Sequence, residues 1–145
     1  YKVTGVQTCA LPILAFVQGS CDLVRGLAPS PAVANTGEAL VLDGADVAAS
    51  ADVRGGSTIG ANAVVSTGSV VDGSVVFDEA IVGEGSEIRG CIIGRGARIG
   101  EGCSLDGVVV GDGAVVGARN EIREGARVWP QVAIPDLAIR YSSDA

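Results

Sequence analysis

The sequence predicts an all-β protein, a parallel β-helix of hexapeptide repeats preceded by a short helix. An aliphatic residue recurs every six positions from Val41 onward, a small residue follows it four positions later, and 22 of 145 residues are glycine. Neither a helix nor a flat strand has a six-residue period. Because 48% of the residues are hydrophobic and only 3% aromatic, the core is expected to consist of aliphatic side chains rather than large rings.

The aliphatic positions form a series in which three steps are shortened. Its members are Val41, Val47, Val53, Ile59, Val65, Val71, Val76, Val82, Ile88, Ile93, Ile99, Leu105, Val110, Val116, Ile122, Val128 and Ile134. The steps that begin at Val71, Ile88 and Leu105 are five residues long and the others six, which gives a 17-residue unit. We interpret this unit as one turn of a triangular coil with one short corner. The series then makes about five coils.

Small side chains occupy the second inward position of the six-residue steps. They are Ala45, Ala51, Ser57, Ala63, Ser69, Ala80, Ser86, Ala97, Cys103, Ala114 and Ala126, with Asn120 and Val132 as departures. One branched and one small residue on each face fit the narrow interior of a three-sided prism, and the glycine-rich positions between them form its corners. Each strand should then pair in parallel with the strand one coil away, at about 4.8 Å.

The segment in front of the repeat has three parts. Residues 3–13 match the in-frame translation of a sequencing-library adapter, so we expect residues 1–13 to be an artefact. A secretory or lipoprotein signal is the alternative, but the apolar run at 10–17 is short and we expect no membrane association. Residues 14–27 have helical apolar spacing, and Pro29 and Pro31 cannot continue a helix.

Residues 28–40 are predicted to be a linker that separates this helix from a β-helix domain at 41–145. The apolar residues of the helix are Phe16, Val17, Leu23, Val24 and Leu27. We expect the face that carries Phe16 and Leu23 to pack on a domain that precedes it. Two pairs, Trp129-Pro130 and Ile134-Pro135, are expected to cap the last coil.

The composition excludes several kinds of chemistry. The absence of histidine removes any imidazole base or metal ligand, and the net charge of −7 argues against nucleic acid as a partner. Outside residues 1–13, the cysteines are Cys21, Cys91 and Cys103, which have no metal-binding spacing. They are expected to be buried, reduced thiols, which favours a cytoplasmic protein.

No catalytic, cofactor-binding or metal-binding residue is predicted. The acidic candidates for an acid–base pair are Glu84, Glu87, Glu101, Asp106, Asp112, Glu121 and Glu124. We expect them to be solvated or paired with the nearby arginines, which are Arg89, Arg95, Arg98, Arg119, Arg123 and Arg127. The glycine-rich stretch at 94–100 superficially resembles a phosphate loop, but it keeps the register of the repeat.

Three features together resemble one family. They are the helix segment at 15–31, the short corners Gly73-Ser-Val-Val, Gly90-Cys-Ile-Ile-Gly and Gly107-Val-Val-Val-Gly, and the tail Gly125-Ala-Arg-Val-Trp-Pro130 with Ile139-Arg-Tyr-Ser-Ser-Asp144. They look like the C-terminal part of the actinobacterial mannose-1-phosphate guanylyltransferases, within the nucleotide-sugar pyrophosphorylases. Gln131 departs from this family, which generally has a small turn residue there.

The resemblance implies a left-handed β-helix behind an N-terminal nucleotide-binding domain that is missing here. The family joins GTP and mannose 1-phosphate, with Mg²⁺, into GDP-mannose and pyrophosphate. Its signature loop G-x-G-T-R-L-x-P-L-T has no counterpart in this sequence, so no catalytic residue can be carried over. We expect a module for domain docking and homo-oligomerisation that is inactive alone. The alternative is a free-standing hexapeptide-repeat scaffold or transferase.

Overall fold

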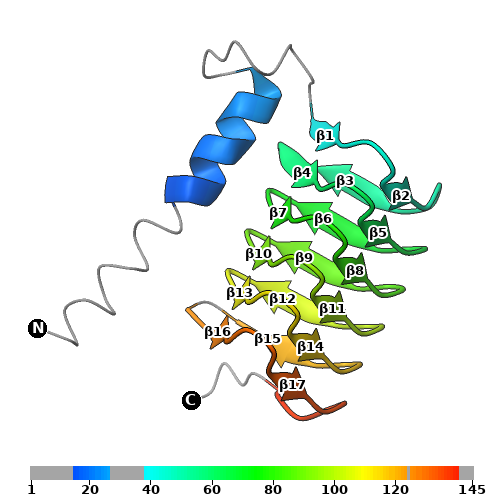
Figure 1. Ribbon diagram of the computed structural model, residues 1–145, viewed down its shortest axis with the longest axis vertical. Coiled ribbons are helices and arrows are strands. Elements are labelled where there is room, and N and C mark those ends of the chain that lie inside the picture. Colours follow the sequence, from blue (N-terminus) through cyan, green and yellow to red (C-terminus); the bar gives the residue numbers. More distant parts are fainter. Residues whose placement is uncertain (1–14, 27–37, 124, 141–145) are drawn as a thin grey trace, which may run out of the picture.

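The chain forms a parallel β-helix with one helix along its side, as the computed structural model shows (Figure 1). The structure describes residues 15–26, 38–123 and 125–140. Within these ranges, 17 short strands form three sheets, which gives between five and six coils. The helix spans residues 15–25. The predicted fold class is therefore confirmed, while the hand of the coil continues to rest on the resemblance.

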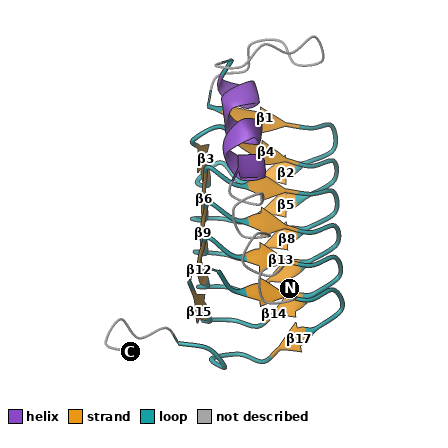
Figure 2. Ribbon diagram, turned by 90° about the vertical axis from the view of Figure 1, so that its left-hand side faces the viewer, coloured by secondary structure: helices purple, strands orange, loops and turns teal. Residues whose placement is uncertain are grey.

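The three sheets are the three faces of the coil (Figure 2). The first contains β1 (Ala39–Val41), β4 (Ser57–Ile59), β7 (Val75–Val76), β10 (Ile92–Ile93), β13 (Val109–Val110) and β16 (Arg127–Val128). The second contains β2 (Asp46–Val47), β5 (Val64–Val65), β8 (Ile81–Val82), β11 (Arg98–Ile99), β14 (Val115–Val116) and β17 (Ala133–Ile134). The third contains β3 (Asp52–Arg54), β6 (Val70–Asp72), β9 (Glu87–Arg89), β12 (Ser104–Asp106) and β15 (Glu121–Ile122).

The strand register follows the repeat. Val71 pairs with Val53 on one side and with Ile88 on the other, so successive coils are offset by 18 residues before the first short corner and by 17 after it. The offset returns to 18 in the last coil, where Val110 pairs with Val128. All of the pairings are parallel, and the aliphatic residues of successive coils stand directly above one another. The triangular coil with one short corner is therefore confirmed.

The core is the column of inward side chains. Ile59 and Ile88 are completely buried, as are Ala63, Ala80, Ala97 and Ala114. Burying each inward valine or isoleucine contributes roughly 1.5–3 kcal/mol, and neighbouring coils share that stabilisation. The column is open at its N-terminal end, where Val41 has the inward register but an exposed fraction of 47%.

The small inward positions at the short corner form a hydrogen-bonded column. The Oγ of Ser57 accepts from the backbone N–H of Ser74 at 3.0 Å, and the Oγ of Ser74 accepts from that of Cys91 at 3.0 Å. The Sγ of Cys91 in turn accepts from the backbone N–H of Val108 at 3.4 Å. Serine and cysteine thus satisfy buried amides that the tight corner leaves without a strand partner.

The last coil agrees with the predicted cap at Ile134-Pro135, where Ile134 packs against the core, but not at Trp129-Pro130. Trp129 has an exposed fraction of 70%, so it does not cover the interior. The amide of Asn120, buried to 1% exposure, donates to the carbonyls of Gly117 and Pro135 and accepts from the N–H of Ile139. Asn120 thus departs from the small-residue pattern because it binds the final segment of the described chain. Gln131 occupies the turn at a φ of 64°, in the column that holds Gly96 and Gly113.

Candidate functional site

One corner of the coil has a glycine in each of four successive coils. Gly55, Gly73, Gly90 and Gly107, here called the glycine corner, follow strands β3, β6, β9 and β12. Their φ angles are 72°, 55°, 57° and 65°, a region that side chains rarely adopt. This explains why glycine recurs at each coil. Because these glycines have no side chain, the surface at this corner is formed by their backbone alone.

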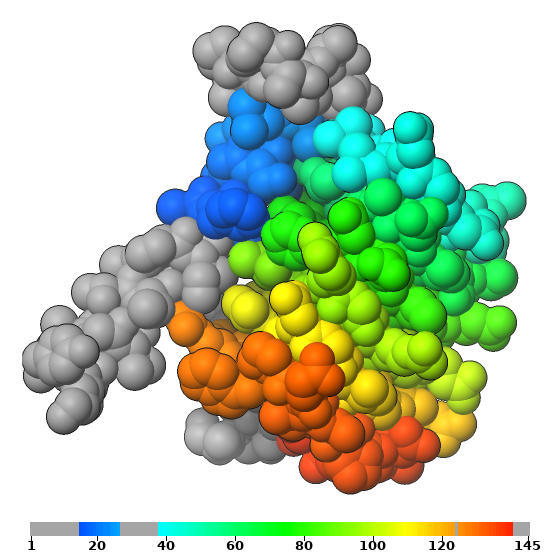
Figure 3. Space-filling view, in the orientation of Figure 1, coloured from blue at the N-terminus to red at the C-terminus, as the bar shows by residue number. Residues whose placement is uncertain are grey.

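The helix lies along this corner, beside the first coils of the β-helix (Figure 3). Its buried side is formed by Val17, Cys21 and Val24, whose exposed fractions are 6%, 5% and 2%. Their spacing of four and three residues places them on one side of a helix. The closest approach is at Gly56, where a Cβ would lie 2.6 Å from the carbonyl oxygen of Cys21. Only glycine allows the two backbones to come this close.

The helix is therefore in contact with the β-helix, not held apart from it as the predicted linker suggested. Residues 28–37 of that linker lie outside the described residues, and its last two residues belong to β1. Phe16 and Leu23 are the large apolar side chains of the helix that stay exposed, at 52% and 37%. The helix thus has a covered apolar side and an adjoining uncovered one.

Glu38 ties the C-terminal end of the helix to the corner. Its carboxylate accepts from the backbone N–H of Gly55 at 3.0 Å and from the guanidinium of Arg25 at 3.3 Å. The hydrogen bond from Gly55, followed by that from Arg25, lowers the pKa of Glu38 below its ordinary value of 4.5. Both bonds are solvent-exposed, so they fix the geometry of the contact more than they stabilise it.

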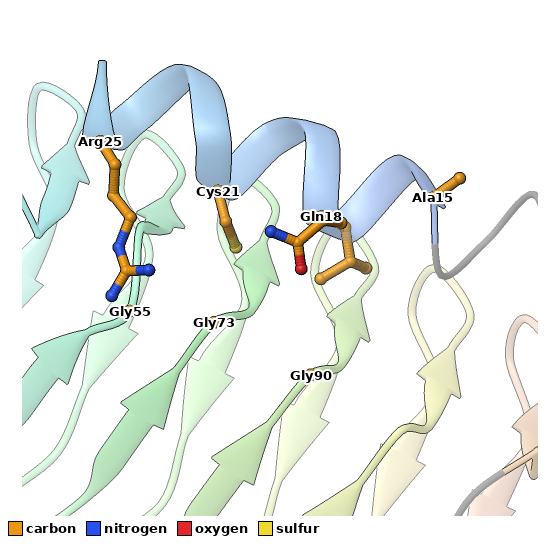
Figure 4. A pocket seen from close by; sticks show the side chains of 8 residues that line it. Ala15, Gln18, Cys21, Arg25, Gly55, Gly73 and Gly90 are labelled. Carbon is orange, nitrogen blue, oxygen red and sulfur yellow. The ribbon is translucent and has the colours of Figure 1, made fainter. Parts of the chain in front are cut away.

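A shallow pocket of about 480 Å³ lies between the helix and the glycine corner (Figure 4). Its lining is Ala15, Val17, Gln18, Cys21, Arg25, Gly55, Gly73 and Gly90. The pocket side chains of the helix face the glycines, which contribute backbone alone. The Cys21 thiol is held neutral, because burial raises its pKa. The lining therefore forms a concave surface with one positive charge, that of Arg25. It has no nucleophile paired with a base.

Burial also keeps the other two thiols protonated. Burial raises the pKa of Cys91 to about 11 and raises that of Cys103 as well. Cys21, Cys91 and Cys103 are all buried and free of disulfides. Within the described ranges, no group of three histidine, cysteine or acidic side chains could hold a metal ion. In the same part of the chain, no helix is long and apolar enough to cross a membrane.

The acidic candidates are distributed over the surface. Glu87 pairs with Arg89, Glu101 with Arg119, and Asp106 and Glu121 with Arg123. Asp112 instead accepts from the backbone N–H of Arg95 at 2.9 Å and so holds a turn. Residue 124 lies outside the described residues. The stretch at 94–100 is a turn and strand of the repeat, and a Cβ at Gly94 would meet Asp112 of the next coil.

Sequence reasoning missed the contact between the helix and Gly56. The available signal was the doubled glycine at 55–56, since the short corners at Gly73, Gly90 and Gly107 have one glycine at this point. The predicted burial of Cys21 is confirmed. Its place on the apolar side of the helix was not predicted, although Cys21 lies four residues after Val17 and three before Val24. A helical wheel drawn with cysteine as an apolar residue would have included it.

Comparisons with known proteins agree with this architecture. The family profile of the GMPPB C-terminal domain matches residues 35–143. The chain is 55% identical over 130 residues to mannose-1-phosphate guanylyltransferase of Mycobacterium tuberculosis strain H37Rv, an alignment that covers 89% of this chain and 36% of that protein. The chain thus spans little more than a third of its curated relative.

Among solved structures, the GDP-perosamine N-acetyl transferase of Caulobacter crescentus is similar, with a TM-score of 0.53 and 23% identity. The match covers 76% of this chain and 60% of that one. At this identity the likeness concerns the β-helix fold.

Proposed function

The chain belongs to the GMPPB C-terminal domain family, and from this premise we propose that it is the β-helix module of a mannose-1-phosphate guanylyltransferase. In the longer protein, a phosphate oxygen of mannose 1-phosphate attacks the α-phosphorus of GTP and pyrophosphate leaves. The module anchors the part of the protein that carries out this reaction. It is not itself the catalyst.

The observation that carries the proposal is the fixed seat of the helix on the glycine corner. The contact between Cys21 and Gly56, together with the bridge from Arg25 through Glu38 to Gly55, holds the helix at one place on the coil. Any polypeptide that enters at residue 15 is therefore positioned relative to the β-helix. An anchoring module has this role, because it fixes the position of the polypeptide that precedes it.

We place catalysis, and the Mg²⁺ that the family uses, in the missing N-terminal part. Mg²⁺ prefers carboxylate and phosphate oxygens in octahedral geometry, and the described residues present no suitable group. A free-standing transferase is the other possibility that the sequence raised. The chain has no histidine to serve as the base of such an enzyme, which favours the anchoring role.

Homo-oligomerisation and a cytoplasmic location are further parts of the proposal. The last coil exposes Trp129 and Leu137 at 70% and 52%, and Leu137 does so at a φ of 55°, which is costly for a leucine. A second copy packed on this coil would bury both. The three buried, unbridged thiols suit a reducing compartment.

The proposal is tested by recovering the full-length gene and measuring pyrophosphate release from GTP and mannose 1-phosphate. We expect activity from the full-length protein and none from the 145-residue chain. Glucose 1-phosphate and other nucleotides serve as controls for specificity. Activity of the chain alone, or inactivity of the full-length protein with every sugar phosphate and nucleotide, would overturn the proposal and leave a scaffold.

A further inference from the structure

The helix carries more apolar surface than the β-helix covers. Successive residues of a helix turn by about 100°, so Phe16 and Leu23 project from nearly the same angle. Val17 and Val24 project from the adjoining angle and are buried, whereas Phe16 and Leu23 keep exposed fractions of 52% and 37%. The apolar stripe is therefore about twice as wide as its contact with the glycine corner.

A small-residue notch separates the two exposed side chains. Gly19 and Ser20 lie between Phe16 and Leu23 on the same side of the helix. A Cβ added at Gly19 would meet no atom within 4 Å, so no contact among the described residues requires a glycine there. Glycine inside a helix is destabilising relative to alanine. Its presence is explained if another element approaches the helix closely at this notch.

We propose that this strip, formed by Phe16, Gly19, Ser20 and Leu23, is the surface on which the N-terminal domain of the full-length protein packs. The inference rests on the proposed function. The relative extends well beyond the match, which covers 36% of its length, and the matching family is named as a C-terminal domain. The helix is the first described element, so the preceding polypeptide enters beside Phe16.

The geometry favours this occupant over a separate partner. A domain joined directly to residue 15 has a high effective concentration at the strip, and a modest apolar contact is then enough to dock it. The helix becomes an element shared by two domains. One side rests on the glycine corner, and the adjoining side receives the N-terminal domain, whose position is thereby fixed relative to the coils.

The test compares Phe16→Ser with Phe77→Ser in the full-length protein and in the 145-residue chain. Phe77 is a matched control, because its exposed fraction is 40% and it lies on the coil rather than on the helix. In the full-length protein we expect Phe16→Ser to accelerate amide exchange of the helix by about tenfold or more and Phe77→Ser to leave it unchanged. In the chain alone, both variants should behave like the parent chain.

Gly19→Ala provides a second variant that does not depend on removing apolar surface. In the chain alone it should slow exchange of the helix, because alanine favours helix, whereas in the full-length protein it should accelerate exchange by obstructing the notch. Equal effects of each variant in the two proteins would overturn the inference.

Two other outcomes would name a different occupant. Dissociation of an oligomer of the chain on Phe16→Ser would assign the strip to a second copy, and no effect in either protein would show that it remains in solvent. Because exchange is measured without substrates, the inference can fail while pyrophosphate release persists. The proposed function can likewise fail while docking is observed.

Discussion

Gly56 lies directly against Cys21, and a Cβ at Gly56 would stand 2.8 Å from the Cα of Cys21. This relationship joins the helix to the β-helix through two backbones. Because Cβ atoms do not approach a backbone this closely, a side chain at this position would force the helix away from the corner.

Gly56→Ala should therefore undock the helix and lower the free energy of unfolding by about 1–3 kcal/mol, since it adds a clash to an unfavourable φ of 80°. Labelling of the Cys21 thiol, read by peptide mass spectrometry, should become faster. Gly90→Ala is the control, because a Cβ there meets nothing within 4 Å although φ is also positive, at 57°. Equal labelling of Cys21 in the two variants would contradict this account.

The Glu38 bridge should make the seat of the helix sensitive to acid. The pKa of Glu38 is lower in the folded protein than its ordinary 4.5, so its contribution is fully present above pH 4.5 and is lost as pH falls through the folded pKa. Glu38→Gln keeps the shape of the side chain and removes this titration. The protection factors of the helix amides, which correct for the pH dependence of intrinsic exchange, should fall more in the parent chain than in the variant between pH 7 and pH 3. Parallel profiles would show that the bridge does not hold the helix.

Asn120→Ala tests how the last coil is closed. Alanine removes the amide that donates to Gly117 and Pro135 and accepts from the N–H of Ile139. The variant should lose all three bonds, which costs about 1–3 kcal/mol for buried groups left unpaired. Amide exchange at Ile139 should rise, while exchange at Ile59 should stay unchanged. Protection of Ile139 in the variant would mean that other contacts close the coil.

The coil itself was predictable because its interior repeats. Inward positions such as Ile88 follow from a period that the sequence displays directly, and each aliphatic residue has an equivalent one coil away. Asn120 broke the pattern, and its partners at Pro135 and Ile139 are set by how the last coil turns, which no repeat encodes. The position of the helix depends on a contact between Cys21 and Gly56, two residues that lie 35 positions apart in the sequence. Local patterns do not specify such pairings.

The outer face of the third sheet carries a column of alternating charge. Arg54, Asp72 and Arg89 are successive register partners, and Asp106 and Arg123 continue the column. In a parallel coil, equivalent residues stack directly, so identical charges would repel one another. Because the charges alternate, stacked neighbours attract one another. The alternation also disfavours a register shift by one coil.

Arg89→Glu should reverse this effect by placing three acidic side chains in succession. We expect a loss of about 1 kcal/mol, larger than that of Arg98→Glu, because Arg98 has the neutral register partners Ile81 and Val115. The difference between the variants should shrink when urea unfolding is repeated at about 1 M salt, where the Debye length is near 3 Å. A difference that does not depend on salt would indicate lost packing instead of charge.

Trp129 provides a direct signal for the proposed self-association, because it is the one tryptophan of the chain and stands 70% exposed on the last coil. If two copies pack through this coil, tryptophan emission should move to shorter wavelength as the protein concentration rises, in step with the mass measured by sedimentation. Leu137→Ser should weaken both changes without altering the coil, since Leu137 is 52% exposed. Phe77→Ser, which removes an exposed side chain from the same corner three coils away from Trp129, should leave both unchanged. Concentration-independent emission in a protein that still sediments as an oligomer would move the interface to another face, and a monomer at all concentrations would remove self-association from the proposed function.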